Sequence, residues 1–390
     1  MRRAARPPFM LAPRERRTLG RTQRFMLALA VVLVHGLAGG RTADAREAVR
    51  VLVPDRDNLQ YASFWLAQGA GYFADEGYDV ELVVPSAPAQ TATFFEERKA
   101  DVAVLPPPVY AGLVARRVPV VLVANLLAND PIDLVVRRSV LEARGLRADM
   151  PLRERLAGLR GVKLGIAPHP PSRLRALYTS VGLDADVDVE MVILHGKEQN
   201  AAFHDGSVDA LYAHTPYLER AIVHDDAVML VDQNRGEVPV LAGRQIHALA
   251  VHRSLLELRA GLATALVRAI ARAEELVHRA PAEAAAVFAR MFPARDRREL
   301  ETIVRLYEPA IPKTPAVSAA QIPNAVTLFP AGQDKPDLSG IDLTKHVAPE
   351  LYAPPKPPVS EAKLALLFVL VAALTATAGI TIVRRRETRV

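Results

Sequence analysis

The stretch NLQYASFWLAQGAGYFADEGYDV, residues 58–80, indicates how this chain folds. The apolar run Val49–Val53 precedes it, and its end continues into a second apolar run, Val80–Val84. Between these runs, Leu59–Glu76 has the residue pattern of a helix, and Gly77 allows the left-handed turn that ends a helix before a strand. A strand, a helix and a second strand of these lengths predict parallel strands and therefore an α/β fold.

The same alternation continues to about Val251. Continuous runs of Val and Leu are typical of strands that are buried on both faces in a parallel sheet. Further strands are expected at Val102–Leu105, Val120–Leu126, Val162–Ile166, Val187–Leu194, Asp209–Tyr212 and Ala227–Val231. The helices between them are expected at Thr91–Lys99, Val109–Ala115, Arg173–Val181, Gln199–Asp205 and Pro216–His224.

These elements form two series of about 90 residues each, which predicts two lobes with parallel sheets. We expect residues 46–136 to form the first part of lobe one, residues 137–247 to form lobe two, and residues 248–352 to return to lobe one. The last part should begin with the strand Ala248–Val251 and continue with helices at Leu255–Arg279, Pro281–Met291, Arg295–Tyr307 and Ser318–Ala331.

Residues 1–45 have the features of a secretory signal peptide. Eight arginines lie within residues 2–24, the apolar run Phe25–Ala38 follows, and Ala43-Asp44-Ala45 has the small-residue spacing of a cleavage site. A basic, an apolar and a small-residue segment in this order predict export. An uncleaved anchor, a later start of translation and a twin-arginine signal are the alternatives.

The C-terminal region predicts a single membrane span. Residues 353–363 form a proline-rich spacer, and residues 364–383 contain no charged side chain. A helix of this length is about 30 Å long, which matches the hydrocarbon thickness of a bilayer. Three arginines begin the tail 384–390, and the positive-inside rule assigns such a cluster to the cytoplasm. We therefore expect a single-pass protein of the cell membrane whose main domain is extracytoplasmic.

Charge and cysteine content exclude several classes of protein. The formal net charge is +6, but the basic residues gather in the two terminal segments, and residues 46–383 carry a net charge of −4. The main domain therefore has no electrostatic support for nucleic-acid binding. The chain has no cysteine, which excludes disulfides, thiolate metal sites and lipid attachment at a cysteine.

Four motifs occur in order along the chain. They are Asn58-x-x-Tyr61 with Gly71-Tyr72-Phe73 and Glu76-Gly77-x-Asp79-Val80, then Lys99-Ala-Asp101-Val, then Leu159-x-Gly161-x-Lys163-x-Gly165, and then Gly206-x-Val208-Asp209-Ala210 with Thr215-Pro216. This set resembles the type II periplasmic binding proteins of ABC importers, in the branch that binds nitrate, sulfonates, taurine and thiamine-pyrimidine precursors. The resemblance covers about residues 48–350.

The resemblance implies a two-lobed α/β clamshell that closes on a small solute and presents it to an ABC permease and its ATPase. It implies a binding protein, not an enzyme, with no cofactor and no nucleic-acid partner. In open α/β sheets ligands bind at the carboxyl ends of the strands, so the loops after the strands are the places to look for the site.

In lobe one the resemblance implies that Asn58 and Tyr61 line the cleft, and an N-cap is the alternative role for Asn58. Phe64 is a candidate aromatic contact, although core packing explains its position equally well. Pro106 follows the third strand where a small polar residue is usual in sulfonate binders. Asn125 ends the fourth strand and can offer an amide to a ligand, or form a turn.

In lobe two, His169 and Ser172 lie in a proline-rich loop before a helix whose N-terminus can accept an anion. Prolines replace the N–H donors that relatives present there, and His169 is either a compensating donor or a solvated side chain. His214 and Thr215 follow a strand and are expected to face the cleft. Glu237 can bind an amine or a pyrimidine, or it is a surface carboxylate.

The donor-poor loops favour a planar, thiamine-pyrimidine-like solute over a plain sulfonate or nitrate. Two other function classes fit part of the pattern. A ligand sensor would need a separate signalling partner, because only seven residues follow the apolar span. Enzymes of this fold that synthesise the thiamine pyrimidine carry a cysteine-rich motif, which this chain lacks. The sequence has no hydrolase, metalloprotease or P-loop motif, and the spacing of its histidines predicts no metal site.

Overall fold

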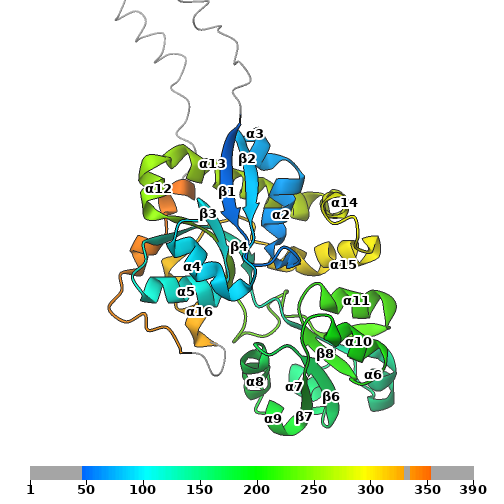
Figure 1. The fold of residues 1–390 in the computed structure, drawn as a ribbon. Helices are drawn as coiled ribbons and strands as arrows, with labels where there is room; N and C mark the ends of the chain where they lie inside the picture. Colours follow the sequence, from blue (N-terminus) through cyan, green and yellow to red (C-terminus); the bar gives the residue numbers. More distant parts are fainter. Residues whose placement is uncertain (1–45, 329–333, 353–390) are drawn as a thin grey trace, which may run out of the picture. The chain divides into compact units, whose positions relative to one another are not determined.

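The computed structural model describes residues 46–328 and 334–352, whose strands form two five-stranded sheets (Figure 1). The first sheet has the order β2-β1-β3-β10-β4, with β1 Glu47–Leu52, β2 Tyr78–Val83, β3 Val102–Leu105, β4 Val120–Ala128 and β10 Gln245–His252. The second has the order β7-β6-β8-β5-β9, with β5 Asp133–Arg137, β6 Val162–Ile166, β7 Val189–Ile193, β8 Ala210–Ala213 and β9 Ala227–Val231.

Both sheets are mixed, whereas the sequence predicted parallel ones. The strands β1, β2 and β3 are parallel, as are β6, β7 and β8. However, β10 runs antiparallel to β3 and β4, and β5 runs antiparallel to β8 and β9. The two antiparallel strands follow the points where the chain changes sheets: β5 is the first strand after the chain enters the second sheet, and β10 is the first after it returns to the first sheet. A helical crossover keeps successive strands parallel, and these two entries have none.

The strand Asp133–Arg137 belongs to the second sheet, although the sequence placed the lobe boundary after residue 136. The chain therefore crosses between the sheets at residues 129–132 and returns before β10, which starts at Gln245 instead of the expected residue 248. Because β4 and β5 are both apolar and fully or almost fully buried, their composition does not indicate which sheet each one joins. We call the first sheet with its helices the first lobe, and the second sheet with its helices the second lobe.

Six helices belong to the second lobe: α6 Arg138–Arg144, α7 Leu152–Ala157, α8 Pro171–Thr179, α9 Ala185–Asp188, α10 Glu198–His204 and α11 Tyr217–His224. The first lobe contains η1 Leu59–Tyr61, α2 Ala62–Gly69, α3 Tyr72–Asp75, η2 Pro88–Gln90, α4 Thr91–Glu96 and α5 Pro107–Ala115. From the returning part of the chain it also contains α12 Arg253–Leu258, α13 Ala260–Arg279, α14 Pro281–Met291, α15 Arg297–Tyr307, η3 Glu308–Ala310, η4 Ala319–Gln321, α16 Asn324–Thr327, η5 Leu343–His346 and η6 Pro349–Tyr352.

Three of the predicted helices are divided. The stretch 59–76 becomes η1, α2 and α3, and Gly71, in a left-handed conformation with φ of 78°, separates α2 from α3. The stretch 255–279 becomes α12 and α13, and Leu258 is 82% exposed at the break between them. The helix expected at 318–331 is only η4 and α16 within the described part, which stops at residue 328.

The first lobe is built on a large apolar core under α2, α13 and α14. Trp65, Phe64 and Phe73 are almost completely buried there, and α13 contributes Leu266 and Ile270 from its apolar face. Burial of each such side chain contributes about 1.5–3 kcal/mol.

The predicted signal peptide 1–45, spacer 353–363, membrane span 364–383 and tail 384–390 lie outside the described residues. Within residues 46–328 and 334–352, no helix is long and apolar enough to cross a membrane.

Candidate functional site

Buried polar side chains gather where β4 ends and β10 begins, next to the two crossings between the sheets. Gln245 is 1% exposed, and neither amide atom has a hydrogen-bond partner among the described residues. His247 is 5% exposed; its Nε2 lies 2.7 Å from Oε1 of Gln60, and its Nδ1 has no partner in the described part. Oδ1 of Asn125, opposite Ala248 in the ladder, is also without a partner there.

Such unpaired atoms are costly. A buried polar atom without a partner destabilises a fold by about 1–3 kcal/mol, and most buried polar atoms in proteins are paired. Three neighbouring residues with unpaired atoms, Asn125, Gln245 and His247, therefore indicate a place where a bound molecule supplies the missing partners. We call these three residues the amide–imidazole group.

A buried ion cluster joins both crossings to the second lobe. Asp130, in the outgoing crossing, is fully buried, and its Oδ2 accepts a hydrogen bond from Nε of Arg173 at 2.7 Å. The same oxygen lies 3.4 Å from Nη1 of Arg244, in the returning crossing. Arg173 belongs to α8, so one carboxylate connects two crossings and a second-lobe helix. We call Asp130, Arg173 and Arg244 the arginine pair with its carboxylate.

The electrostatics link this cluster to the amide–imidazole group. Burial, followed by the charges of His214 and Arg173, lowers the pKa of His247 to about 3. Burial also lowers the pKa of His214, and the charge of Arg173 acts in the same direction. Both imidazoles are therefore neutral at pH 7. His247 comes from β10 of the first lobe and Arg173 from α8 of the second. The charge of a second-lobe side chain therefore acts on a first-lobe side chain.

Two of the five predicted first-lobe residues border the amide–imidazole group. Tyr61 is 2% exposed and meets the ring of His247 edge-on, with 4.9 Å between ring centroids. Asn125 belongs to the group itself. Asn58 caps η1, since its Oδ1 accepts the N–H of Gln60 at 2.9 Å, so its side chain has the alternative role that the sequence allowed.

The other two first-lobe candidates have structural partners. Phe64 is fully buried in the core, with its ring centroid 5.1 Å from that of Trp65 and 5.7 Å from that of Phe73. Pro106 precedes α5, and its carbonyl accepts the N–H groups of Val109 and Tyr110. The structure therefore gives Phe64 a packing role and Pro106 a role at a helix start.

In the second lobe, Thr215 lies at the junction of the lobes. It is fully buried, its peptide bond to Pro216 is cis, and its N–H donates to Oη of Tyr307 at 2.9 Å. The Tyr307 hydroxyl in turn donates to the carbonyl of Pro131 in the outgoing crossing at 3.1 Å. Nδ1 of His214 lies 2.5 Å from the Thr215 carbonyl, so Nδ1 carries the proton and neutral His214 presents Nε2 as an acceptor.

The remaining second-lobe candidates lie apart from this junction or are already engaged. His169 is exposed, and within the described part of the chain its ring has no hydrogen-bond partner. Ser172 donates to the carbonyl of Leu328 at 3.4 Å. Glu237 binds the guanidinium of Arg155, whose side chain is 5% exposed, and accepts the N–H of Asp232 at 2.9 Å. The geometry thus gives Glu237 a structural partner instead of a free carboxylate.

The sequence did not mark five residues of this neighbourhood: Asp130, Arg173, Arg244, Gln245 and His247. A signal was present in the sequence. Asp130 and the pair Arg244-Gln245 stand directly beside the apolar strands that enter and leave each lobe, and Arg173 is in the first turn of the helix after the Pro170-Pro171 loop. Polar residues at lobe crossings are candidates for an interlobe site, because both lobes meet there.

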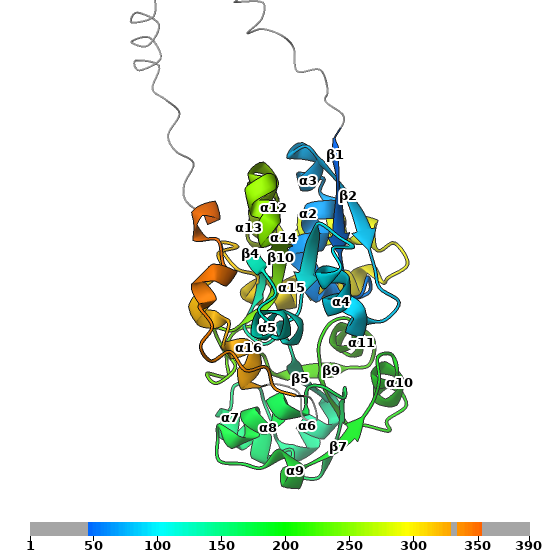
Figure 2. The same cartoon turned by 60° about the vertical axis from the view of Figure 1, so that its left-hand side comes forward.

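The segment 312–328 contacts both lobes beside the site. Its Pro315 carbonyl accepts the N–H of Asn125 at 2.8 Å, and its Asn324 carbonyl accepts Nη2 of Arg244 at 2.8 Å. Ile322 is fully buried in the first lobe, whereas Leu328 packs against the core of the second. Figure 2 shows α16, within this segment, next to α5. The segment therefore forms a third connection between the lobes, in addition to the two crossings.

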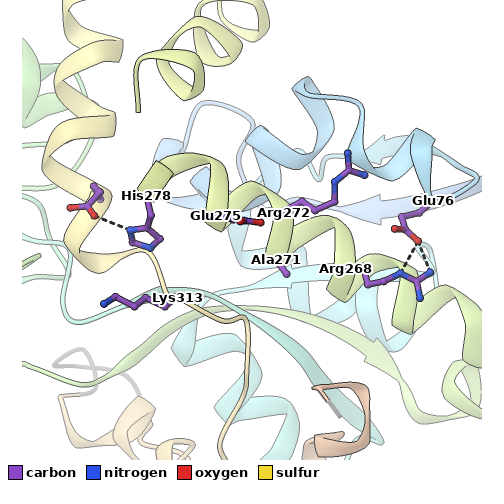
Figure 3. Close-up of a pocket in the computed structure, with 8 residues that line it drawn as sticks. Glu76, Arg268, Ala271, Arg272, Glu275, His278 and Lys313 are labelled. Carbon is purple, nitrogen blue, oxygen red and sulfur yellow. Dashed lines mark hydrogen bonds and ion pairs between the residues drawn. The ribbon is translucent and has the colours of Figure 1, made fainter. Parts of the chain in front are cut away.

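A pocket of about 480 Å³ opens between the loop before η1, the second-lobe helices α10 and α11, and the start of α15 with the residues before it. Its lining combines cationic, anionic and amide side chains with an aromatic ring: Asp57, Lys197, Asn200, His204, Tyr217, Arg220, Arg295 and Glu299. A second pocket, of about 750 Å³, lies on the outer surface of α13, away from the strand ends (Figure 3).

The α13 pocket has the character of a surface groove held by ion pairs. Figure 3 shows Arg268 bound to Glu76. Nδ1 of His278 lies 2.8 Å from Oε1 of Glu308. Although this pocket is larger, we place the candidate site at the crossings, because three residues whose buried polar atoms lack partners in the described part of the chain, Asn125, Gln245 and His247, lie together there. Among the described residues, no group of three or more His, Asp or Glu side chains is positioned to hold a metal ion.

The sequence profile of the NMT1/THI5-like family matches residues 58–284. The chain belongs to this family. The matched range contains the amide–imidazole group and the arginine pair with its carboxylate. A protein of Haemophilus influenzae named for thiamine biosynthesis is 29% identical over 169 residues, which is 43% of this chain. The match spans half the length of that relative.

Solved structures share the fold at low identity. The aliphatic sulphonate-binding protein SsuA of Escherichia coli has a TM-score of 0.57 at 18% identity, covering 78% of this chain and 99% of SsuA. The alkanesulfonate-binding SsuA of Xanthomonas axonopodis, bound to MOPS, has 0.53 at 15%, covering 77% and 98%. The nitrate-binding NrtA of Synechocystis has 0.54 at 13%, covering 79% and 87%. The expected periplasmic-binding-protein fold is therefore confirmed, with two mixed sheets.

Proposed function

We propose that this protein is the extracytoplasmic solute-binding component of an ABC importer, and that it binds a small organic solute between its lobes. The observation that carries the proposal is the amide–imidazole group, in which Oδ1 of Asn125, both amide atoms of Gln245 and Nδ1 of His247 lack partners in the described part of the chain. A bound solute would provide those partners, and binding next to both crossings would couple the solute to the arrangement of the lobes.

The proteins that share the fold support transport over catalysis, because SsuA and NrtA are named as binding proteins. The relative named for thiamine biosynthesis supports a thiamine-pyrimidine-like solute. An amide such as that of Gln245 can donate and accept at once, which suits the edge of a planar heterocycle. A solute of this kind, or a sulfonate- or nitrate-like one, is our proposal for the cargo.

We also propose that residues 1–45 direct export and that residues 364–383 anchor the protein in the cell membrane. Support comes from the uncharged stretch of 20 residues and the arginine cluster after it. Membrane fractionation tests the anchor: the full chain should stay in the membrane after carbonate extraction, and a chain ending at residue 352 should be released. Release of both forms would contradict the proposal.

Thermal unfolding of the purified chain tests the binding function. Thiamine-pyrimidine precursors, taurine, alkanesulfonates and nitrate would each be added at increasing concentration. A solute at 100 times its Kd stabilises the fold by about 2.7 kcal/mol, which raises Tm by several degrees. If no compound in these classes raises Tm, the proposed function loses its support.

A further inference from the structure

Two buried arginines share one carboxylate at the lobe crossings. The side chains of Arg173 and Arg244 are 13% and 5% exposed, and that of Asp130 is fully buried. Resting on the proposed binding function, we infer that the solute carries a monoanionic carboxylate or sulfonate group, and that the two terminal nitrogens of Arg173 receive it.

Within the described part of the chain, the two terminal nitrogens of the Arg173 guanidinium, Nη1 and Nη2, are free to bind a ligand. Only Nε binds Asp130, and no described residue makes a hydrogen bond to Nη1 or Nη2. By contrast, Arg244 uses Nη1 for Asp130 and Nη2 for the carbonyl of Asn324. A guanidinium whose Nε is fixed by a buried carboxylate is held in one orientation, and its two remaining nitrogens match two oxygens of a planar or tetrahedral anion.

The charge balance points to a single negative charge. One carboxylate faces two guanidinium groups, and both nearby imidazoles, His214 and His247, are neutral because burial lowers their pKa. Burial also lowers the pKa of Arg244, and the charge of Arg173 adds to this effect while Asp130 opposes it. A buried charge without a counter-ion is costly, so one further anion would complete the cluster.

Asp133 does not provide this counter-charge. It is fully buried, and its carboxyl oxygens accept hydrogen bonds from the N–H groups of Gln233 and Asn234 and from the Asn234 amide. Burial raises its pKa well above the usual range, which favours its neutral form. The Asp133 carboxyl therefore binds the turn after β9 and does not neutralise the excess positive charge at the crossings.

The amide–imidazole group lies in the same electrostatic neighbourhood, since the charge of Arg173 acts on His247. The inferred solute thus has two ends. Its anionic group meets Arg173 of the second lobe, and its polar body meets Gln245, His247 and Asn125 of the first. A molecule held in this way would contact both lobes at once.

Matched acid and amide pairs test the inference on the full chain. Nicotinate and nicotinamide, benzoate and benzamide, and methanesulfonate and methanesulfonamide would be titrated at constant ionic strength, with Tm as the readout. The variants are R173Q and R173K, with R175Q as the control. Arg175 lies on the same helix, is 45% exposed and binds Asp186 on the surface.

We expect at least one acid, and not its amide, to stabilise the wild type and R175Q alike. Loss of hydrogen bonds to a charged group weakens binding by about ten- to a hundredfold, so R173Q should need a correspondingly higher acid concentration. R173K keeps the charge but loses the fork, and should fall in between. Should R173Q fail to fold, the R173K comparison alone decides, because a weaker response to the acid than in R175Q is still required.

Two results would overturn the inference in different ways. If amides stabilise as well as acids, or if R173Q and R173K bind acids like the wild type, the proposed binding function stands and the anion assignment is wrong. If neither these pairs nor the thiamine precursors, sulfonates and nitrate stabilise the protein, both proposals are wrong.

Discussion

At the scale of single residues, the main feature is a set of buried polar atoms that have no hydrogen-bond partner among residues 46–328 and 334–352. Gln245 and Glu274 represent two kinds of such residues. Gln245 stands beside the lobe crossing, whereas Glu274 lies on α13 inside the first lobe, and burial raises the pKa of its carboxyl well above the usual range. Only the first kind is positioned to meet a solute.

Replacing Gln245 by Leu should therefore stabilise the protein and impair binding. The substitution removes two unpaired buried atoms, so the free energy of unfolding should rise by about 1–2 kcal/mol, while a stabilising solute should bind about tenfold more weakly. Urea unfolding and solute titration measure the two effects. The control is E274L, which should stabilise by a similar amount without changing solute affinity. Lower stability with unchanged affinity in Q245L would refute this role.

Glu237 is expected to matter for stability and not for binding. The E237Q variant leaves the buried guanidinium of Arg155 with the carbonyl of Leu230, at 2.5 Å, but without its carboxylate. Because Glu237 is 30% exposed, we expect a loss of about 1–3 kcal/mol in urea unfolding. The E301Q variant removes an exposed pair with Arg297 and should change stability little. If E237Q binds the solute more weakly and E301Q does not, Glu237 contacts the solute and this prediction is wrong.

Some residues of the candidate site could be predicted from the sequence, and others could not. Asn125 was predicted as the residue that ends the fourth strand, although β4 continues to Ala128, and Tyr61 was predicted because the resemblance marks it. The partner of Glu237 was not, because Arg155 lies 82 positions earlier in the chain. Arg173 was missed for the same reason: its importance depends on Asp130, 43 positions away.

At the scale of elements, the segment 312–328 supports the site from outside. It supplies the carbonyl that satisfies the Asn125 N–H and the carbonyl that holds Arg244. Its attachment depends on a few buried apolar side chains, among them Val317, Ile322 and Ala325. The sequence predicted only a helix in this proline-rich region, because its contacts are long-range and its regular structure is short.

Weakening this attachment should expose the edge of β4. The I322A variant removes a fully buried side chain and should lower the free energy of unfolding by about 2–5 kcal/mol. Local detachment should also accelerate hydrogen exchange at the Asn125 amide, whose partner is Pro315. Exchange measured on β4 peptides checks this. If Asn125 exchanges as slowly as in the wild type while stability falls, the segment does not protect the site.

The contact between α11 and α15 contains a carboxyl that should make stability depend on pH. Glu219 is fully buried, and burial raises its pKa from 4.5 to about 8, with the nearby carboxylate of Glu299 adding to the effect and Arg295 opposing it. The folded protein therefore holds a proton that the unfolded chain releases. The contribution of Glu219 to stability is complete below pH 4.5 and is lost as pH rises to about 8.

The E219Q variant isolates this contribution. Between pH 5 and pH 8 the wild type should lose about 3 kcal/mol relative to E219Q, because glutamine does not titrate. His247 acts in the opposite direction, since its lowered pKa destabilises the fold as pH falls towards about 3, but it is present in both proteins. Urea midpoints at the two pH values measure the difference. Parallel pH profiles for the two proteins would show that Glu219 titrates normally.

At the scale of the whole molecule, the chain passes between two mixed sheets at two crossings, and the buried polar residues of the candidate site lie at or next to these crossings. Most strands and helices could be predicted from apolar runs and turn residues. The sheet that β5 joins could not, because the pairing of equally apolar strands depends on the three-dimensional neighbours and not on composition. The prediction of the site was limited for the same reason. Some of its residues at strand ends were identified from the sequence, but its residues at the crossings were not.

The proposed function requires that one solute contacts both lobes. Hydrogen exchange of the full chain, with and without a solute that raises Tm, tests this most directly. We predict slower exchange in the first-lobe peptides around residues 58–64 and 243–249, and at the same time in the second-lobe peptides around residues 170–178 and 212–218. Protection confined to one lobe, or found only around the α13 pocket, would contradict solute binding between the lobes.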